Sequence, residues 1–126
     1  MTDIKLHEGE LNIMELLWSN KCLAAKDIAK IIKDYVGWEK NTTYTVIKRL
    51  VEKGAIKRED PGFICRAIIS KRAIQFSETE GLLDKFYSGS LIKFFIDYLE
   101  NQVLSLEEVG ELQKIVNDYY NKNSKI

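Results

Sequence analysis

The chain has 126 residues with 19 basic and 19 acidic side chains, so its formal net charge at pH 7 is zero. With 45% hydrophobic residues, this is the composition of one ordinary globular domain, or of a small domain with an appendage. Its apolar stretches fall far short of the about 20 residues that span a bilayer, which excludes a membrane helix. The first residues lack the apolar run of a signal peptide, so we expect a cytoplasmic protein.

The residue types that metal binding and nucleophilic catalysis need are scarce. His7 is the only histidine, and Cys22 and Cys65 are too far apart for a CxxC pair. The seven glycines form no phosphate-binding loop. We therefore expect no enzyme, no metal site and no cofactor. Cys65 is expected to be a small buried hydrophobe, and Cys22, in a connecting segment, is the better candidate for a reactive thiol.

The charge is distributed unevenly along the chain. Residues 1–72 carry 14 basic and 10 acidic side chains, whereas residues 73–126 carry 5 basic and 9 acidic ones. Between Lys40 and Arg58, six basic residues accompany one acid, Glu52. Such a cluster fits a module that meets phosphate on one surface, although charge alone fits a solvated helix face equally well.

Apolar residues at three- and four-residue spacing predict two helices near the N-terminus. The first covers Glu8–Ser19. Its apolar positions are Leu11, Met14, Leu17 and Trp18, and Glu10 and Glu15 are left outside. The second covers Ala25–Tyr35, and its predicted buried stripe is Ile28, Ile31, Ile32 and Tyr35.

A third helix is predicted over Asn41–Lys53, where polar residues suited to capping begin it and Gly54 ends it. Its buried side is predicted to be Thr43, Val46, Ile47 and Leu50. Its other side carries hydroxyls, an aromatic ring and charges: Thr42, Tyr44, Thr45, Lys48, Arg49 and Glu52. The ring of Tyr44 could pack on the segment after Gly54, but its position on the helix favours an exposed ring.

Two short apolar segments, Ala55–Arg58 and Phe63–Ile69, flank Glu59-Asp60-Pro61-Gly62, which is typical of a β-hairpin. Three helices followed by a hairpin form the layout of a winged helix, with a recognition helix and a wing. We therefore expect a mainly α fold with a small β-hairpin wing. It comprises a winged helix-turn-helix domain over residues 1–70 and a C-terminal helical dimerisation domain over residues 71–126.

The C-terminal part is predicted to form three helices. Lys71–Ser88 ends at Gly89, Ser90–Glu100 is apolar nearly all round, and Ser105–Glu108 has the spacing of a capping box. Helices with so much apolar surface must pack against another surface. They could fold back onto the N-terminal lobe, but a homodimer is favoured because two-fold dimers are the commonest assembly.

Several segments resemble the penicillinase-repressor family, which includes the β-lactamase, methicillin-resistance and copper-responsive repressors. Glu10–Trp18 resembles the opening helix of that family. Trp38, Thr42–Leu50 and Lys53-Gly54 resemble its recognition helix, and Tyr87–Ser90 resembles its dimerisation segment. The resemblance extends over nearly the whole chain.

The resemblance implies a dimeric repressor whose partners are operator DNA and a second copy of the chain. By position, the DNA-binding residues are Lys26, Asn41, Thr42, Tyr44, Thr45, Lys48, Arg49, Arg58 and Arg66. Hydroxyl, amide and guanidinium groups can read base edges in the major groove, and phosphate contacts supply most of the affinity. For Thr42 and Thr45, capping or back-bonding to the helix remains the structural alternative.

The resemblance also implies a dimer interface on the C-terminal helices. Its residues are Leu83, Phe86, Tyr87, Leu91, Phe94, Phe95, Tyr98, Leu99, Leu112 and Val116. The penicillinase repressors are inactivated by cleavage at an Asn-Phe bond, which makes a sensor protease a further candidate partner. The matching step here is Asp97-Tyr98, which puts release by proteolysis in question. Copper-responsive members carry closely spaced cysteines near the C-terminus, and this chain has none after Cys65.

A winged helix can instead bind a protein, or serve as a partner subunit that dimerises without touching DNA. A protein-binding face would expose aliphatic residues on the third helix. The hydroxyls and cations found there favour DNA, so the sequence predicts a transcriptional repressor over a protein-interaction module.

Overall fold

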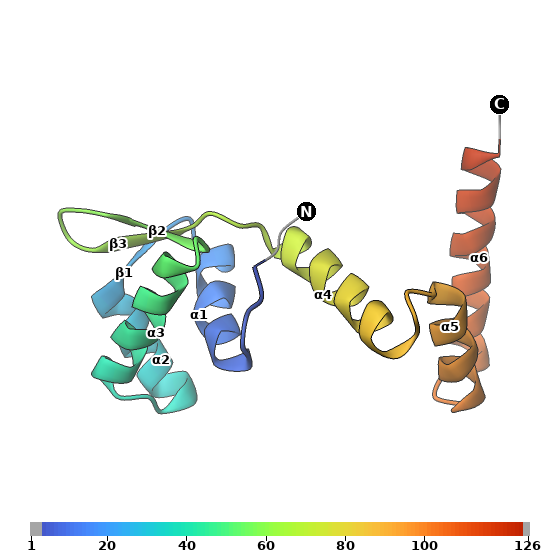
Figure 1. The fold of residues 1–126 in the computed structure, drawn as a ribbon, viewed down its shortest axis with the longest axis horizontal. Coiled ribbons are helices and arrows are strands. Elements are labelled where there is room, and N and C mark those ends of the chain that lie inside the picture. The colour runs from blue at the N-terminus through green and yellow to red at the C-terminus, as the bar shows by residue number, and fades with distance from the viewer. Residues whose placement is uncertain (1–3, 125–126) are drawn as a thin grey trace. The chain divides into compact units, whose positions relative to one another are not determined.

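The computed structural model describes residues 4–124, which form six α-helices and three short strands (Figure 1). In chain order they are α1 Glu8–Ser19, β1 Leu23–Ala24, α2 Ala25–Val36, α3 Lys40–Glu52, β2 Ile56–Glu59, β3 Ile64–Ala67, α4 Lys71–Phe86, α5 Leu91–Glu100 and α6 Leu106–Asn123. The chain divides into two compact units, the first ending at Gly81 and the second beginning at Leu82. This division lies inside α4, further along the chain than the boundary after residue 70 that the sequence indicated.

The core of the first unit lies where α1, α2 and α3 meet the small sheet. Each helix contributes residues three or four positions apart, because this spacing places them on one face. The buried cluster is Ile13, Met14, Leu17, Ala25, Ile28, Ile32, Val46, Ile47, Leu50, Ala55, Ile56 and Cys65. The buried side predicted for α3 is confirmed, with Thr43 also fully buried.

The stripe predicted for α2 is wrong at its end. Ile28 and Ile32 are buried, but Tyr35 is 84% exposed and Ala29 is buried in its place. Tyr35 lies in the last turn of the helix, where it lines a solvent-facing groove with Leu11 rather than the core. Periodicity identified the correct face of the helix but not how far the core reaches along it.

Glu10 was expected outside and is instead buried, with 1% of its surface exposed. Its Oε1 atom accepts a 2.6 Å hydrogen bond from Lys53 Nζ and a 2.7 Å bond from the backbone nitrogen of His7. Burial alone would raise the pKa of this carboxyl. The bond from His7 and the ammonium group of Lys53 outweigh burial and hold the pKa below its ordinary value of 4.5. Glu10 therefore joins the start of α1 to the residue that follows α3.

The third helix begins at Lys40, and Glu39 stands at its N-cap without a side-chain capping bond. The polar residues that were expected to cap it lie inside its first turn. Its C-terminus is as predicted, because Gly54 has a φ of +82°. The N–H of Gly54 bonds to the carbonyl of Val51, and that of Ala55 bonds to Leu50. These two bonds form a Schellman motif, which favours glycine because glycine takes this conformation without strain.

The predicted hairpin is formed by β2 and β3, and β1 adds a third strand that the sequence did not reveal. The sheet is antiparallel with the order β1-β3-β2. Leu23 pairs with Cys65 and Ala24 with Ile64. Cys65 is fully buried, as expected, and burial raises the pKa of its thiol to about 11. The thiol is therefore protonated at neutral pH, which argues against a sensor role for Cys65.

In the second unit, none of the described residues of α5 or α6 is buried. The Ser90 hydroxyl accepts a 3.1 Å hydrogen bond from the backbone nitrogen of Lys93 at the start of α5. Ser105 and Glu108 form the predicted capping box at the start of α6. Among the described residues, no helix has both the length and the hydrophobicity to cross a membrane.

Candidate nucleic-acid interface

The exposed side of α3 is polar along the helix. Its exposed residues are Lys40, Asn41, Thr42, Thr45, Lys48, Arg49 and Glu52. They lie on this side because the apolar residues of α3 occupy the core. The structure therefore brings together the α3 residues predicted to contact DNA, except that Tyr44 is half-buried.

The hydroxyl of Thr45 donates a 2.9 Å hydrogen bond to the carbonyl of Asn41, one turn earlier. This is the back-bonding role that the sequence left open. A hydroxyl that donates can still accept, so Thr45 keeps the ability to receive a bond from a ligand. Thr42 is exposed in the first turn of α3, where Glu39 occupies the N-cap position.

Tyr44 packs on the wing, which corrects the exposed position that the sequence favoured. Its ring centroid lies 5.8 Å from that of Phe63, with an interplanar angle of 56°. Lys40 Nζ is 5.6 Å from the centroid of the Tyr44 ring, and the Arg58 guanidinium carbon is 3.6 Å from that of Phe63. We call Lys40, Tyr44, Phe63 and Arg58 the aromatic column. It joins α3 to the wing and has a cation at each end.

Phe63 is a residue whose importance the sequence did not indicate. It has a φ of +49°, in the left-handed region where a bulky side chain is uncommon. The preceding Gly62 also has a positive φ of +96°. The Asp-Pro-Gly signal predicted the turn, but no local pattern indicated that the ring of Phe63 would contact α3.

Both wing arginines form ion pairs within the hairpin. Arg58 Nε lies 3.1 Å from Asp60 Oδ2, and Arg66 Nε lies 3.0 Å from Glu59 Oε1. All four side chains are between 43% and 60% exposed. Exposed pairs contribute about 0–1 kcal/mol, so an incoming phosphate can replace either carboxylate at little cost.

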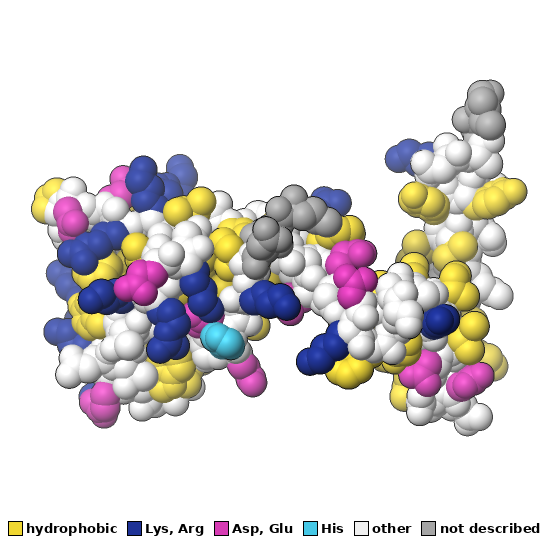
Figure 2. All heavy atoms as spheres, in the orientation of Figure 1, with side chains coloured by type: hydrophobic (Ala, Val, Ile, Leu, Met, Phe, Trp, Pro, Cys, Tyr) yellow, Lys and Arg dark blue, Asp and Glu magenta, His cyan; other side chains and the backbone are white. Residues whose placement is uncertain are grey.

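Lys26 is exposed at the second position of α2. It lines a cleft with Lys30, Lys33 and Lys40, three lysines that were not predicted to belong to the site. The spacing of Lys26, Lys30 and Lys33 on the polar face of α2 was a signal for the two α2 lysines, whereas Lys40 begins α3. Figure 2 shows that Lys and Arg side chains are numerous over the first unit.

The residues predicted for a dimer interface form an extensive apolar surface in the second unit. Phe86, Leu91, Tyr98, Leu99 and Val116 are exposed, and Tyr87, Phe94, Phe95 and Leu112 are half-buried. Leu83 differs, because only 6% of it is exposed and its own chain already covers it. Further apolar residues of α5 and α6 that were not predicted are also exposed: Ile92, Ile96, Leu106, Ile115, Tyr119 and Tyr120.

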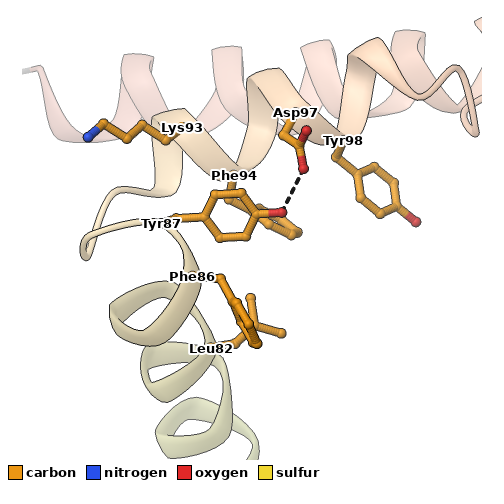
Figure 3. A pocket seen from close by; sticks show the side chains of 7 residues that line it. All are labelled: Leu82, Phe86, Tyr87, Lys93, Phe94, Asp97 and Tyr98. Atoms are coloured by element: carbon orange, nitrogen blue, oxygen red, sulfur yellow. Dashed lines mark hydrogen bonds between the residues drawn. The ribbon is translucent and has the colours of Figure 1, made fainter.

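A hollow of about 700 Å³ lies between the end of α4 and α5 (Figure 3). Tyr87 donates a 2.8 Å hydrogen bond to Asp97 Oδ2 there, and this bond raises the pKa of the tyrosine. The ring of Phe94 lies edge-on to that of Tyr87, with centroids 5.3 Å apart. The Asp97-Tyr98 step, which the resemblance implied as a cleavage-equivalent position, lies inside α5, and both residues are exposed.

Three helices and a β-hairpin, with a polar third helix joined to the hairpin, define a winged-helix protein that continues into a helical C-terminal unit. The fold class expected from the sequence is confirmed. The family model described as Penicillinase repressor matches residues 6–118. The chain therefore belongs to the penicillinase repressor family, a family of transcriptional repressors.

Curated relatives match the chain over nearly its whole length. The penicillinase repressor of Bacillus licheniformis is 26% identical over 123 residues, which cover 96% of each chain. The methicillin resistance regulatory protein MecI of Staphylococcus aureus (strain N315) is 26% identical over 115 residues, covering 90% of this chain and 94% of MecI.

Two solved structures share the fold. The solution structure of the DNA binding domain of the repressor BlaI gives a TM-score of 0.52 at 24% identity, covering 56% of this chain and 90% of that chain. The complex structure of hsRosR-S4 gives a TM-score of 0.51 at 17% identity, covering 94% of this chain and 92% of that chain.

Proposed function

We propose that this protein is a DNA-binding transcriptional repressor that places α3 in the major groove and the β2–β3 wing on the adjacent backbone. The observation that carries the proposal is the polar outer side of α3, which offers amide, hydroxyl and cationic groups next to two wing arginines. An α-helix fits the major groove, and these groups match the donors and acceptors of base edges. The DNA-binding domain of BlaI, which has the same fold, supports this assignment.

The groups divide by reach and chemistry. Asn41, Thr42 and Thr45 lie in the first half of α3 and are proposed to read base edges. Lys48 and Arg49 lie further along and are proposed to contact either base edges or phosphates. Lys26, Arg58 and Arg66 flank α3 on α2 and the wing, and they are proposed to hold phosphates. Tyr44 packs against Phe63 of the wing.

We also propose that the repressor acts as a homodimer through α5 and α6. A monomer that leaves Ile92, Ile96 and Tyr119 at least half exposed presents far more apolar surface than soluble monomers usually do. A two-fold dimer covers such a surface and doubles the DNA-binding units. It therefore predicts a pseudo-palindromic operator whose half-sites lie about 34 Å apart, one helical turn, or a multiple of that.

A mobility-shift assay tests this proposal. The purified chain is mixed with DNA from upstream of its own gene and with random competitor DNA, in a salt series from 50 to 200 mM. We expect a specific shift at two chains per operator that weakens steeply with salt, because bound phosphates release counterions. A genome-wide binding selection covers operators elsewhere. Binding no tighter than to random DNA in both experiments would contradict the repressor assignment and favour a protein-interaction module.

A further inference from the structure

A cleft between α2 and the start of α3 carries a concentration of positive charge, of which the contacts proposed above use only Lys26. It encloses about 240 Å³ and is lined by Lys26, Ala29, Lys30, Lys33, Glu39 and Lys40. Ala29 is buried and small, so the lysines stand around a hollow rather than over a bulky side chain. Four lysine side chains therefore line a hollow, mostly through their alkyl chains, and bring four positive charges to one part of the surface.

Three of these lysines repeat along one face of α2. Lys26, Lys30 and Lys33 are separated by four and three residues, which places them in one row. Within residues 4–124, the ion pairs of the four cleft lysines amount to Lys33 with Glu39, at the limiting distance of 4.0 Å. Like charges at this spacing destabilise a helix. The row is thus better suited to binding anions than to stabilising the free protein.

The dimensions of the row fit a nucleic-acid backbone. At 1.5 Å per residue, Lys26 and Lys33 lie about 10 Å apart along the helix axis. The phosphates of one DNA strand are spaced about every 3.4 Å along the helix axis and further apart through space, so a row of this length can reach more than one phosphate. An isolated small anion would use only one end of it.

The cleft is continuous with the outer side of α3. Lys40 lines the cleft and also lies over the ring of Tyr44 in the aromatic column. The acidic groups nearby are Glu39 at the cleft itself and Asp27 and Asp34 beside the lysines on α2. They leave the cleft with a net positive charge beside the surface that is proposed to enter the groove.

We propose that Lys30, Lys33 and Lys40 join Lys26 in a phosphate-binding row that holds consecutive phosphates of one DNA strand beside α3. This inference rests on the proposed DNA-binding function and adds a second backbone contact to that of the wing. The row carries no base information. It raises affinity for the operator and for random DNA alike. It also sets how far α3 enters the major groove.

The test compares wild type with Lys30→Gln/Lys33→Gln in a salt series on operator and on random DNA. Glutamine keeps the helix propensity, so the variant is expected to fold normally. Each phosphate contact contributes about 0.9 to the slope of log affinity against log salt, so the slope should fall by about 1.8 on both DNAs. The affinity ratio of wild type to variant should then shrink about twelvefold between 50 and 200 mM salt.

Two further variants complete the test. Lys114→Gln/Lys122→Gln removes the same charge from α6 and should leave the slope unchanged. Glu39→Gln removes the carboxylate at the cleft and should strengthen binding to both DNAs. If wild type binds with a steep slope and the α2 variant keeps that slope, the phosphate-binding row is wrong and the proposed function stands. If wild type shows no salt-sensitive binding, the proposed function itself fails.

Discussion

The carbonyl oxygen of Phe63 accepts a 2.9 Å hydrogen bond from the backbone nitrogen of Ala25, the first residue of α2. The N-cap of this helix is Ala24, whose side chain has no capping group. The wing therefore supplies a partner for the first backbone N–H of α2, one of the donors that have no acceptor within the helix. Phe63 thus contacts α2 through its backbone, and α3 and Arg58 through its ring.

Replacing Phe63 tests how far the ring stabilises this arrangement. Phe63→Ala should lower the free energy of unfolding by about 2 kcal/mol, because it removes half-buried apolar area, a ring–ring contact and a cation–π contact. Phe63→Gly should cost about 1 kcal/mol less than Phe63→Ala, because glycine has no penalty in the left-handed conformation. Urea unfolding of the two variants measures the difference. An alanine variant more stable than the glycine variant would show that the positive φ of Phe63 is not kept.

The ion pair between Glu10 and Lys53 should make the stability depend on acid. Because the folded-state pKa of Glu10 lies below 4.5, its carboxylate stabilises the fold above pH 4.5. That contribution is lost as the pH falls through the folded value. Glu10→Gln should therefore unfold more easily at pH 7, by about 1–3 kcal/mol, and should lose less stability on acidification than wild type.

Lys53→Met is the matched variant for this pair. It leaves the Glu10 carboxylate buried without its cation, which typically costs about 3–5 kcal/mol and exceeds the loss from removing the carboxylate charge. Thermal unfolding at pH 7 should rank wild type above Glu10→Gln, and Glu10→Gln above Lys53→Met. Equal stability of the three proteins would mean that the pair is replaced by solvent.

Thr45 and Lys48 should differ in what they contribute to DNA binding. If Thr45 reads a base edge, Thr45→Ala should cost about 1–3 kcal/mol on the operator and less on random DNA. If Lys48 holds a phosphate, Lys48→Ala should weaken both DNAs to a similar degree. Fluorescence anisotropy with both DNAs measures this, and Lys114→Gln on α6 is the control. Equal losses on both DNAs for Thr45→Ala would remove its proposed role in reading bases.

The dimer is best tested at an exposed position of α5. Ile92 is 69% exposed, so Ile92→Asp should leave the monomer folded and split the dimer, since an unpaired buried charge is expensive. Phe95 is less suitable, because it lines a groove with Leu112 of α6 in its own chain. Gln75→Asp, at an exposed position of α4, introduces the same charge in the first unit as a control. Sedimentation at micromolar concentration decides, and an unchanged dimer mass for Ile92→Asp would place that residue outside the interface.

The sequence predicted the features that depend on local signals. Apolar spacing located the helices, the Asp-Pro-Gly segment located the hairpin, and Gly54 marked the end of α3. Each of these signals lies within a few residues of the structure that it specifies. The outer side of α3 followed from the same periodicity, because its buried side was predicted correctly.

Features that depend on distant partners could not be predicted in this way. Glu10 is buried because Lys53, 43 residues away, supplies a cation. The position of Tyr44 depends on Phe63, which lies on the wing, and the two-residue strand β1 is too short to show alternation. The spacing of the lysines on α2 can be seen in the sequence. The cleft that they line together with Lys40 of α3 depends on how the two helices pack.

The connection between α3 and the wing consists of residues 53–55, and each of them is fixed. Lys53 bonds to Glu10, Gly54 and Ala55 bond to the end of α3, and Ala55 is fully buried. The connection has no further residues, so we expect α3 and the hairpin to keep a fixed spacing. A partner that contacts both α3 and the wing therefore meets a fixed spacing between them. Variation among bound sequences must then be accommodated by side chains alone, or by bending of the partner.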